Sequence, residues 1–297
     1  MLGGLKNLEI VMIQIQKINK QYPVIAWWSG GVTSAVTCYL CILWFGVENV
    51  RVVFIDTKNE DVSTYVFKEQ CEKWYGCKIE TITNTNYETI QDVWYRFNSL
   101  NVSTGAICSS TLKRDVRRKF ESHNNYSYQA FGFDADEMKR AKAMSSNNAK
   151  SNPFFPLLMV MLLKKDCFNI ITSAKSLFLE IDIPESYKLG YNNNNCRKTG
   201  CVQGGIGYWQ KMDRDSPEKV DAMGKVEHDL TDRKGSPVTM LKNSRGPIFL
   251  RKHPIFPEIQ ILADVEGREP KPLLECNGFC GTNDLIKNET EKEINYQ

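Results

Sequence analysis

The stretch from Trp27 to Ala35, "WWSGGVTSA", joins two apolar runs of different length. The run before it, "VIAWW", is short and follows Pro23, which is typical of a buried strand. The run after it, "SAVTCYLCILWFG", is too long for a strand and ends at Gly46, which predicts a buried helix with a glycine stop. A strand, a glycine-containing turn and a helix therefore open the fold.

The same alternation continues along the chain. Apolar strand patterns follow at 49–57, 77–83 and 127–133, and helical patterns at 61–76, 87–97 and 111–121. Strands that alternate with helices pair in parallel, because each crossover returns the chain to the same end of the sheet. We therefore expect an α/β fold with an open, mostly parallel sheet and helices on both faces.

The alternation of strand and helix patterns ends after about residue 185. The segment "YNNNNCRKTGCVQGGIGYWQ" that follows is polar, glycine-rich and contains two cysteines. We read the asparagine tract as a turn former. From there on we expect loops and short helices. The predicted organisation is an α/β domain over residues 1–190, with an N-terminal helix over 1–22, and a loop-rich cysteine-bearing region over 191–297 packed on it.

Composition excludes some classes of protein. The 297 residues are 42% hydrophobic and 25% charged with a formal charge of +3, which is ordinary for a globular chain and says little about partners. We find no apolar stretch of about 18 residues and no cationic segment before a clean apolar core, so neither a membrane span nor a secretory signal is predicted. The expected location is the cytoplasm.

The turn itself has the chemistry of a phosphate site. Gly30 and Gly31 permit a positive φ and a close approach of a ligand to the backbone. The following helix would point its N–H groups and the positive end of its dipole at an anion. Ser29, Thr33 and Ser34 add hydroxyl groups. The alternative is an ordinary turn between a strand and a helix.

This stretch resembles the S-G-G-x-D-S pyrophosphate loop of the adenine nucleotide α-hydrolase (PP-loop) superfamily, through Ser29, Gly30, Gly31 and Ser34. Thr33 stands where ATP-cleaving members usually have Asp, and Val32 replaces a frequent Lys. The resemblance implies a Rossmann-like fold of the HUP type and a bound adenine nucleotide, either ATP, with Mg²⁺ if ATP is cleaved, or the sulfonucleotides PAPS and APS.

Three more stretches resemble the phosphoadenylylsulfate reductase family and its phage and bacterial members; a phage-encoded chain would act in the host cytoplasm. "FIDT" places Asp56 and Thr57 at a strand end, beside the expected adenosine, although an ordinary turn Asp is equally compatible. "FGFDADEMKR" resembles a nucleotide-binding element, with Arg140 three residues after Glu137; the alternative is a surface ion pair. The members of this element are Gly132, Asp134, Glu137 and Arg140.

"GAICSSTLKRDVRRKFE" resembles the cysteine-bearing segment that precedes a basic helix in these reductases. Its cations would give the helix a positive face, and we assign Lys113 to the nucleotide site. A solvated charged face is the alternative. The cations are Lys113, Arg114, Arg117 and Arg118.

The ten cysteines fall into two groups. The first is expected to be buried or incidental: Cys38, Cys41, Cys71, Cys77 and Cys167. The second lies in polar, glycine-rich loops and offers thiolates for a metal: Cys108, Cys196, Cys201, Cys276 and Cys280. The family resemblance favours an iron–sulfur cluster over zinc, and free thiols or a redox-active pair stay open. His123, His228 and His253 match no ligand spacing.

Three functions follow from the resemblance. The first is an ATP-using enzyme that forms AMP and pyrophosphate to activate a nucleotide or nucleic acid for sulfur transfer or a related modification, with a thiol or sulfur-donor protein as a partner. The second is a sulfonucleotide reductase that releases sulfite by attack of Cys276, which follows Glu275 as in the family's E-C-G-x-H tail but lacks the histidine. The third binds adenine nucleotide without turnover. The expected catalytic residues are Cys276, Lys113 and Arg140.

Overall fold

A computed structural model describes residues 21–102, 105–176, 180–194 and 196–270. The predicted N-terminal helix over 1–22 falls almost wholly outside these residues, as do Cys276 and Cys280.

The described chain forms one five-stranded sheet in the order β3-β2-β1-β6-β7, with all neighbours parallel. This confirms the predicted α/β fold and its parallel sheet. The strands are β1 (Val24–Trp28), β2 (Val50–Ile55), β3 (Glu80–Ile82), β6 (Gln129–Ala130) and β7 (Pro153–Phe154).

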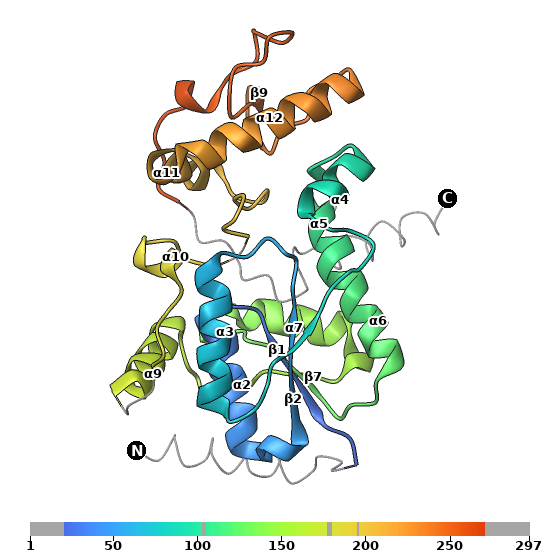
Figure 1. Cartoon of the computed structure of the whole chain (residues 1–297), viewed down its shortest axis with the longest axis vertical. Helices are drawn as coiled ribbons and strands as arrows, with labels where there is room; N and C mark the ends of the chain where they lie inside the picture. The colour runs from blue at the N-terminus through green and yellow to red at the C-terminus, as the bar shows by residue number, and fades with distance from the viewer. Residues whose placement is uncertain (1–20, 103–104, 177–179, 195, 271–297) are drawn as a thin grey trace.

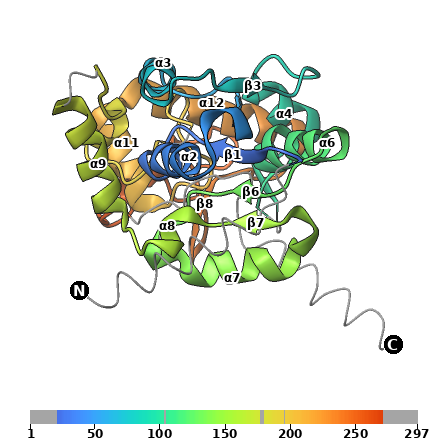
Figure 2. The same cartoon turned by 90° about the horizontal axis from the view of Figure 1, so that it is seen from below.

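Helices cover both faces of the sheet, because consecutive strand residues point to opposite sides. Val24, Ala26 and Trp28 pack with α2, α3 and α9, whereas Ile25 and Trp27 pack with α6 and α7. Figure 2 shows α2, α3 and α9 on one side of the strands and α6 on the other, with α7 below β7. These helices are α2 (Val32–Phe45), α3 (Val62–Tyr75), α6 (Asp115–His123), α7 (Met138–Asn147), α8 (Pro156–Met159), α9 (Lys164–Ser176) and α10 (Glu185–Lys188), with short turns η1 (Val47–Asn49), η3 (Ala135–Glu137) and η4 (Ala149–Ser151).

Two predicted elements differ in extent from the observed ones. The strand expected over 127–133 is only Gln129–Ala130, because Asp134 caps the turn η3 and the chain leaves the sheet before it. The helix expected over 111–121 begins as a π-helical turn, η2 (Ser110–Arg114), and continues as α6.

The strand order reverses direction at β1. The chain runs from β1 outward to β2 and β3, and then returns to place β6 on the other side of β1. Ligands of open α/β sheets bind outside the carboxyl ends of the strands at this kind of switch point. The segment after β1, 29–34, and the segment after β6, 131–134, both lie there.

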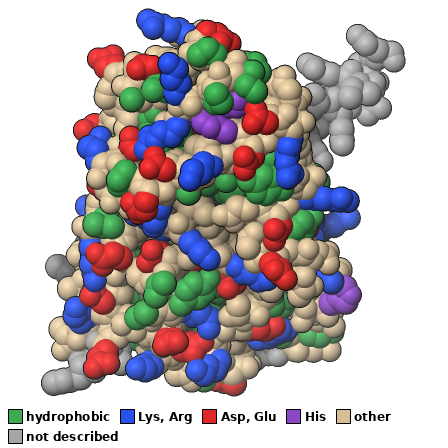
Figure 3. Space-filling model, turned by 45° about the horizontal axis from the view of Figure 1, so that its top comes forward, with side chains coloured by type: hydrophobic (Ala, Val, Ile, Leu, Met, Phe, Trp, Pro, Cys, Tyr) green, Lys and Arg blue, Asp and Glu red, His purple; other side chains and the backbone are tan. Residues whose placement is uncertain are grey.

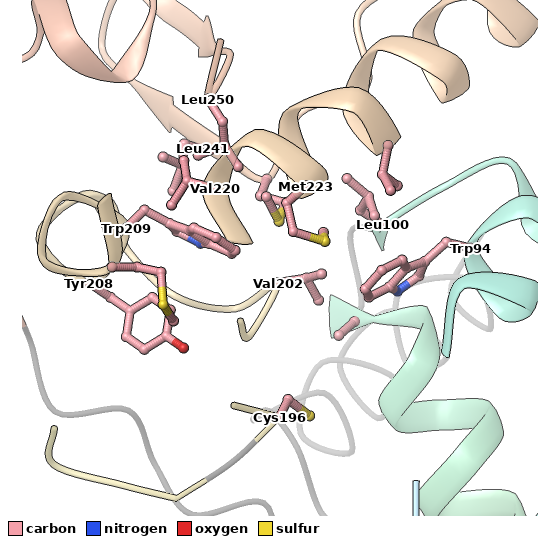
Figure 4. Close-up of a cluster of buried hydrophobic side chains, with 14 of the residues drawn as sticks. Trp94, Leu100, Cys196, Val202, Tyr208, Trp209, Val220, Met223, Leu241 and Leu250 are labelled. Atoms are coloured by element: carbon pink, nitrogen blue, oxygen red, sulfur yellow. The ribbon is translucent and has the colours of Figure 1, made fainter. Parts of the chain in front are cut away.

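A second lobe lies above this edge of the sheet (Figure 1). Its apolar core joins the segment 90–112 to residues from Tyr191 onward (Figure 4). The boundary at residue 190 stays a prediction, but this core is assembled from both sides of it. Its elements are α4 (Ile90–Phe97), β4 (Asn101–Val102), β5 (Gly105–Ala106), α5 (Ile107–Ser109), α11 (Ile206–Asp215), α12 (Pro217–Lys234), β8 (Leu241–Asn243), β9 (Gly246–Ile248) and η5 (Leu262–Asp264).

The expectation of only loops and short helices beyond residue 185 was wrong for α12. This helix has 18 residues, begins with Pro217 and ends at Gly235 in the left-handed conformation. Both residues are usual helix boundaries. Its buried face packs Val220, Met223 and Leu230 into the lobe.

Glu227 holds the lobe together from inside. Its buried carboxyl group accepts hydrogen bonds from the backbone N–H groups of Met240 (2.9 Å) and Leu250 (2.7 Å). Burial raises the pKa of Glu227 to about 8, although both hydrogen bonds act in the opposite direction. The helix α12 is thereby tied to the β8–β9 hairpin.

This carboxyl should make the stability of the protein depend on pH. A carboxyl group with a raised pKa binds its proton more tightly in the folded chain, so its contribution is complete below the pKa of the unfolded chain and is lost as the pH rises to about 8. We expect urea denaturation to give a lower free energy of unfolding at pH 8 than at pH 5. The difference should shrink in Glu227→Gln; an unchanged difference would contradict this assignment.

No helix in the described part of the chain is both long enough and apolar enough to cross a membrane.

Candidate functional site

The loop after β1 is closed on itself by Ser34. The Ser34 hydroxyl accepts a hydrogen bond from the Ser29 backbone N–H (3.0 Å) and donates to the Gly31 carbonyl (2.9 Å). Gly30 adopts the left-handed region at φ 85°. A Cβ there would lie 2.7 Å from Cγ2 of Thr64, so glycine is required both by conformation and by space.

Gly132, after β6, packs directly on the start of α2. A Cβ at this position would lie 2.8 Å from both Cα and the backbone nitrogen of Ser34 and 3.1 Å from the carbonyl carbon of Thr33. Thr33 and Ser34 are buried. The structure thus brings together three of the predicted segments: the loop 29–31, the start of α2, and Gly132.

The strand end after β2 carries Asp56 and Thr57, as expected. One Asp56 oxygen accepts hydrogen bonds from the Lys58 backbone N–H (2.7 Å) and the Tyr65 hydroxyl (2.9 Å). Thr57 is buried, and its hydroxyl donates to Glu60 at 3.1 Å. Burial together with the neighbouring Asp56 raises the pKa of Tyr65. This tyrosine therefore stays a hydrogen-bond donor to the carboxylate.

The turn η3 and the start of α7, which follow β6, are stabilised by two of their own carboxylates. Asp134 caps η3 by accepting from the Asp136 backbone N–H at 3.0 Å. Glu137 and Arg140 form an ion pair on one side of the helix, as their spacing predicted. The Arg140 guanidinium also lies 4.6 Å from the ring centroid of Phe133. A direct role of these residues toward a nucleotide stays a prediction.

Lys113 is buried rather than displayed on a positive surface. Its Nζ lies 3.8 Å from Oε1 of the buried Glu60. Burial lowers the pKa of Lys113, but the opposite effect of its charged neighbours, Glu60 first among them, is larger, and the net shift is upward. Burial raises the pKa of Glu60 despite the attraction of Lys113. The two groups form a desolvated pair beside the end of β2.

The expected positive face of the basic helix is only partly present. Lys113 and Arg117 are both buried, and Arg117 pairs with Glu121 at 3.3 Å, so their charges do not reach solvent. On the face drawn in Figure 3, acidic and basic side chains are interspersed. A long single-sign surface is what a nucleic-acid backbone selects. The helix gives such a partner little support.

The structure brings three of the five candidate ligand cysteines to Lys113. Cys108, Cys196 and Cys201 each interact electrostatically with Lys113. Burial raises the pKa of Cys108 to about 12 and that of Cys201 to about 11, so neutral thiols are favoured. Cys196 belongs to the lobe core and lies at its lower end in Figure 4.

These thiols do not by themselves make a metal centre. Over the described ranges, no three side chains of His, Cys, Asp or Glu are placed to hold a metal ion. Cys276 and Cys280 lie outside the described residues. An iron–sulfur cluster or zinc on the five cysteines therefore stays a prediction without support from this part of the chain. The first cysteine group behaves as expected, with Cys38, Cys41, Cys71 and Cys167 buried.

Two residues of this site were missed in the sequence. Glu60 lies in the polar segment "KNED", which looks like a solvated turn, yet its carboxylate also accepts from the Cys196 backbone N–H at 3.2 Å. Asn194 belongs to the asparagine tract, yet its side chain is buried against Gly30. Glu60 lies in the loop between β2 and α3, four residues after Asp56, and this nearness to the end of a strand is a signal that could have drawn attention to it.

The fold and this edge of the sheet define an α/β protein with a glycine-containing loop at its switch point. Residues 23–158 match the family model of the phosphoadenosine phosphosulfate reductase domain. This match covers 136 of the 297 residues and confirms the resemblance seen in the motifs of that part of the chain. No curated protein matches the chain.

Solved structures with related architecture are distant. A phosphoadenylyl-sulfate (PAPS) reductase from Candida auris, in a phosphate complex, is 14% identical with a TM-score of 0.43, and the match covers 62% of this chain and 85% of that one. An NH3-dependent NAD synthetase from Campylobacter jejuni, in complex with a nitrate ion, is 16% identical with a TM-score of 0.40, covering 78% and 92% of the two chains.

Proposed function

We propose that this protein binds ATP at the switch point and cleaves it between the α- and β-phosphates, so that the adenylyl group activates a nucleotide or nucleic-acid substrate for sulfur transfer or a related modification. One observation carries the proposal: Gly30 is held in the left-handed conformation against Thr64 directly before the 14-residue helix α2. Such a loop presents backbone N–H groups and a helix dipole to an anion.

The nucleotide would lie across the carboxyl ends of the strands. Its phosphates would contact Ser29, Gly30, Gly31, Thr33 and Ser34, and its adenosine would lie toward Asp56 and Thr57. Asp134, which caps η3 after the neighbouring strand β6, would border the same edge of the sheet. The match of residues 23–158 to a nucleotide-using family supports this placement.

Cleavage would proceed by attack of an acceptor oxygen on the α-phosphorus. The bond from that phosphorus to the bridging oxygen breaks, and pyrophosphate leaves with the bonding electrons. Negative charge then grows on the leaving group, where fixed cations are most effective. Lys113 and Arg140 would supply them; each pairs with a carboxylate in the structure, Glu60 and Glu137 respectively. Mg²⁺ would accompany ATP and neutralise part of its charge.

Product analysis tests the proposal against its alternatives. Protein purified without oxygen should convert α-labelled ATP to pyrophosphate and an adenylylated acceptor in the presence of Mg²⁺ and a suitable acceptor. AMP should follow when a sulfur nucleophile attacks the activated acceptor and displaces it, and no sulfite should be released from PAPS or APS. Sulfite release that is lost in Cys276→Ser would instead establish a sulfonucleotide reductase. Tight ATP binding with no product under any of these conditions would favour a non-catalytic nucleotide-binding component. Absence of binding to every one of these nucleotides would overturn the assigned site.

A further inference from the structure

The buried side chain of Asn194 connects the phosphate loop to a part of the chain more than 150 residues further along the sequence. Asn194 donates hydrogen bonds from Nδ2 to the Gly30 carbonyl (3.0 Å) and to the Thr64 hydroxyl (2.8 Å). Its Oδ1 accepts from the Ser186 hydroxyl at 2.6 Å. The residue is 1% exposed. Its amide is thereby fixed in orientation by three groups from three separate segments.

The bond to Gly30 determines where the loop directs its donors. The peptide unit is planar and trans, so the Gly31 N–H points opposite to the Gly30 carbonyl. Holding that carbonyl toward Asn194 therefore aims the Gly31 N–H away from Asn194. Glycines flank this peptide on both sides, so it is otherwise easy to rotate, because glycine has several accessible conformations.

A second contact from the same region reaches the start of α2. The Tyr187 hydroxyl lies 3.4 Å from the Val32 backbone N–H and can accept its hydrogen bond. Residues 186–194 thus contact the loop both before and after Gly31. This segment lies outside the matched family domain, which ends at residue 158.

The same chain segment is anchored at its other end to the Lys113 cluster. The Cys196 backbone N–H donates to Glu60, and the Lys198 backbone N–H donates to the Asn59 carbonyl at 3.2 Å. Asn59 in turn donates from its amide to the Thr199 hydroxyl at 2.8 Å. The segment therefore spans the distance between the phosphate loop and the buried ion pair.

We infer that Asn194 is a positioning residue for the phosphate loop, which holds the Gly30–Gly31 peptide in the orientation that accepts the phosphates. This inference rests on the proposed function. Loss of the Asn194 amide donor leaves the buried Gly30 carbonyl without that hydrogen bond. The Gly30–Gly31 peptide then rotates or binds water, and its N–H no longer points at the phosphates. The effect should therefore depend on whether the ligand carries phosphate.

Calorimetric titration with two ligands, ATP and adenosine, tests the inference. Asn194→Ala should weaken ATP binding about tenfold and leave adenosine binding unchanged. Asn194→Asp has nearly the same shape but cannot donate to Gly30, so it keeps the test valid if the alanine variant unfolds. Thr64→Val should shift ATP binding in the same direction by a smaller factor.

Thr231→Val is the matched control. Thr231 lies in α12 of the second lobe, far from the phosphate loop in the sequence. Its buried hydroxyl accepts a hydrogen bond from the Val238 backbone N–H at 2.9 Å. It should lower the melting temperature without changing either dissociation constant. Equal ATP affinity in wild type and both Asn194 variants, or an equal loss for adenosine, would overturn the inference. Failure of the wild-type protein to bind ATP would instead overturn the proposed function on which it rests.

Discussion

Replacing Gly132 by alanine should abolish ATP binding, raising the dissociation constant by about 100-fold or more, which corresponds to about 3 kcal/mol. The added Cβ would lie 2.8 Å from backbone atoms of Ser34, and no flexible side chain can move away to accommodate it. Either β6 or the start of α2 must shift. Because the loop 29–31 leads directly into α2, the shift would misplace the N–H groups that we propose contact the phosphates.

The measurement is calorimetric titration with ATP, together with thermal denaturation. Overpacking of this kind costs about 1–3 kcal/mol of stability, so the melting temperature should fall as well. Gly267→Ala is the matched control, because a Cβ there meets no atom within 4 Å and the residue is exposed. Gly132→Ala behaving like Gly267→Ala in both measurements would refute the close packing on which the site depends.

Replacing Lys113 by methionine should strongly destabilise the protein, by about 3–5 kcal/mol. The substitution keeps the apolar stem but leaves the Glu60 carboxylate buried opposite an uncharged group. The double variant Glu60→Gln with Lys113→Met should recover most of the lost stability, since neither charge is then buried. It should not recover ATP cleavage if Lys113 acts on the leaving group.

Urea denaturation of Lys113→Met, Glu60→Gln and the double variant measures the coupling free energy between Lys113 and Glu60. Lys78→Met is the control: Lys78 pairs with Glu72 at 2.7 Å, but its side chain is 90% exposed. Its loss should cost less than about 1 kcal/mol. A Lys113→Met protein as stable as the Lys78→Met protein would show that the Lys113–Glu60 pair is not desolvated as described.

The local elements of the fold could be predicted because their signals are local. The first strand "VIAWW", the helix that stops at Gly46 and the helix that stops at Gly76 depend on apolar spacing and on glycine, and the structure places them where expected. The short β6 could not be predicted, because its end depends on Asp134 capping the following turn. Apolar periodicity alone extends that strand to residue 133.

Candidate site residues could be predicted where they lie close together in the sequence, and could not where the contact joins residues that are far apart in it. The loop 29–34 is one contiguous motif, and the pairing of Glu137 with Arg140 follows from their helical spacing. Lys113 and Glu60 are far apart in the sequence, so neither burial nor pairing could be read from a basic run or a polar turn. The predicted positive face is therefore only partly present, because Lys113 and Arg117 are buried.

By itself, the sequence determined the strand–loop–helix order and the glycines of the loop 29–34, since each depends on neighbouring residues. Only the tertiary structure decided that Gly132 abuts Ser34, that Glu60 neutralises Lys113, and that Asn194 holds the carbonyl of Gly30. These contacts join segments separated by dozens of residues. They exist only because the parallel sheet collects its strand ends at one edge, where the second lobe covers them.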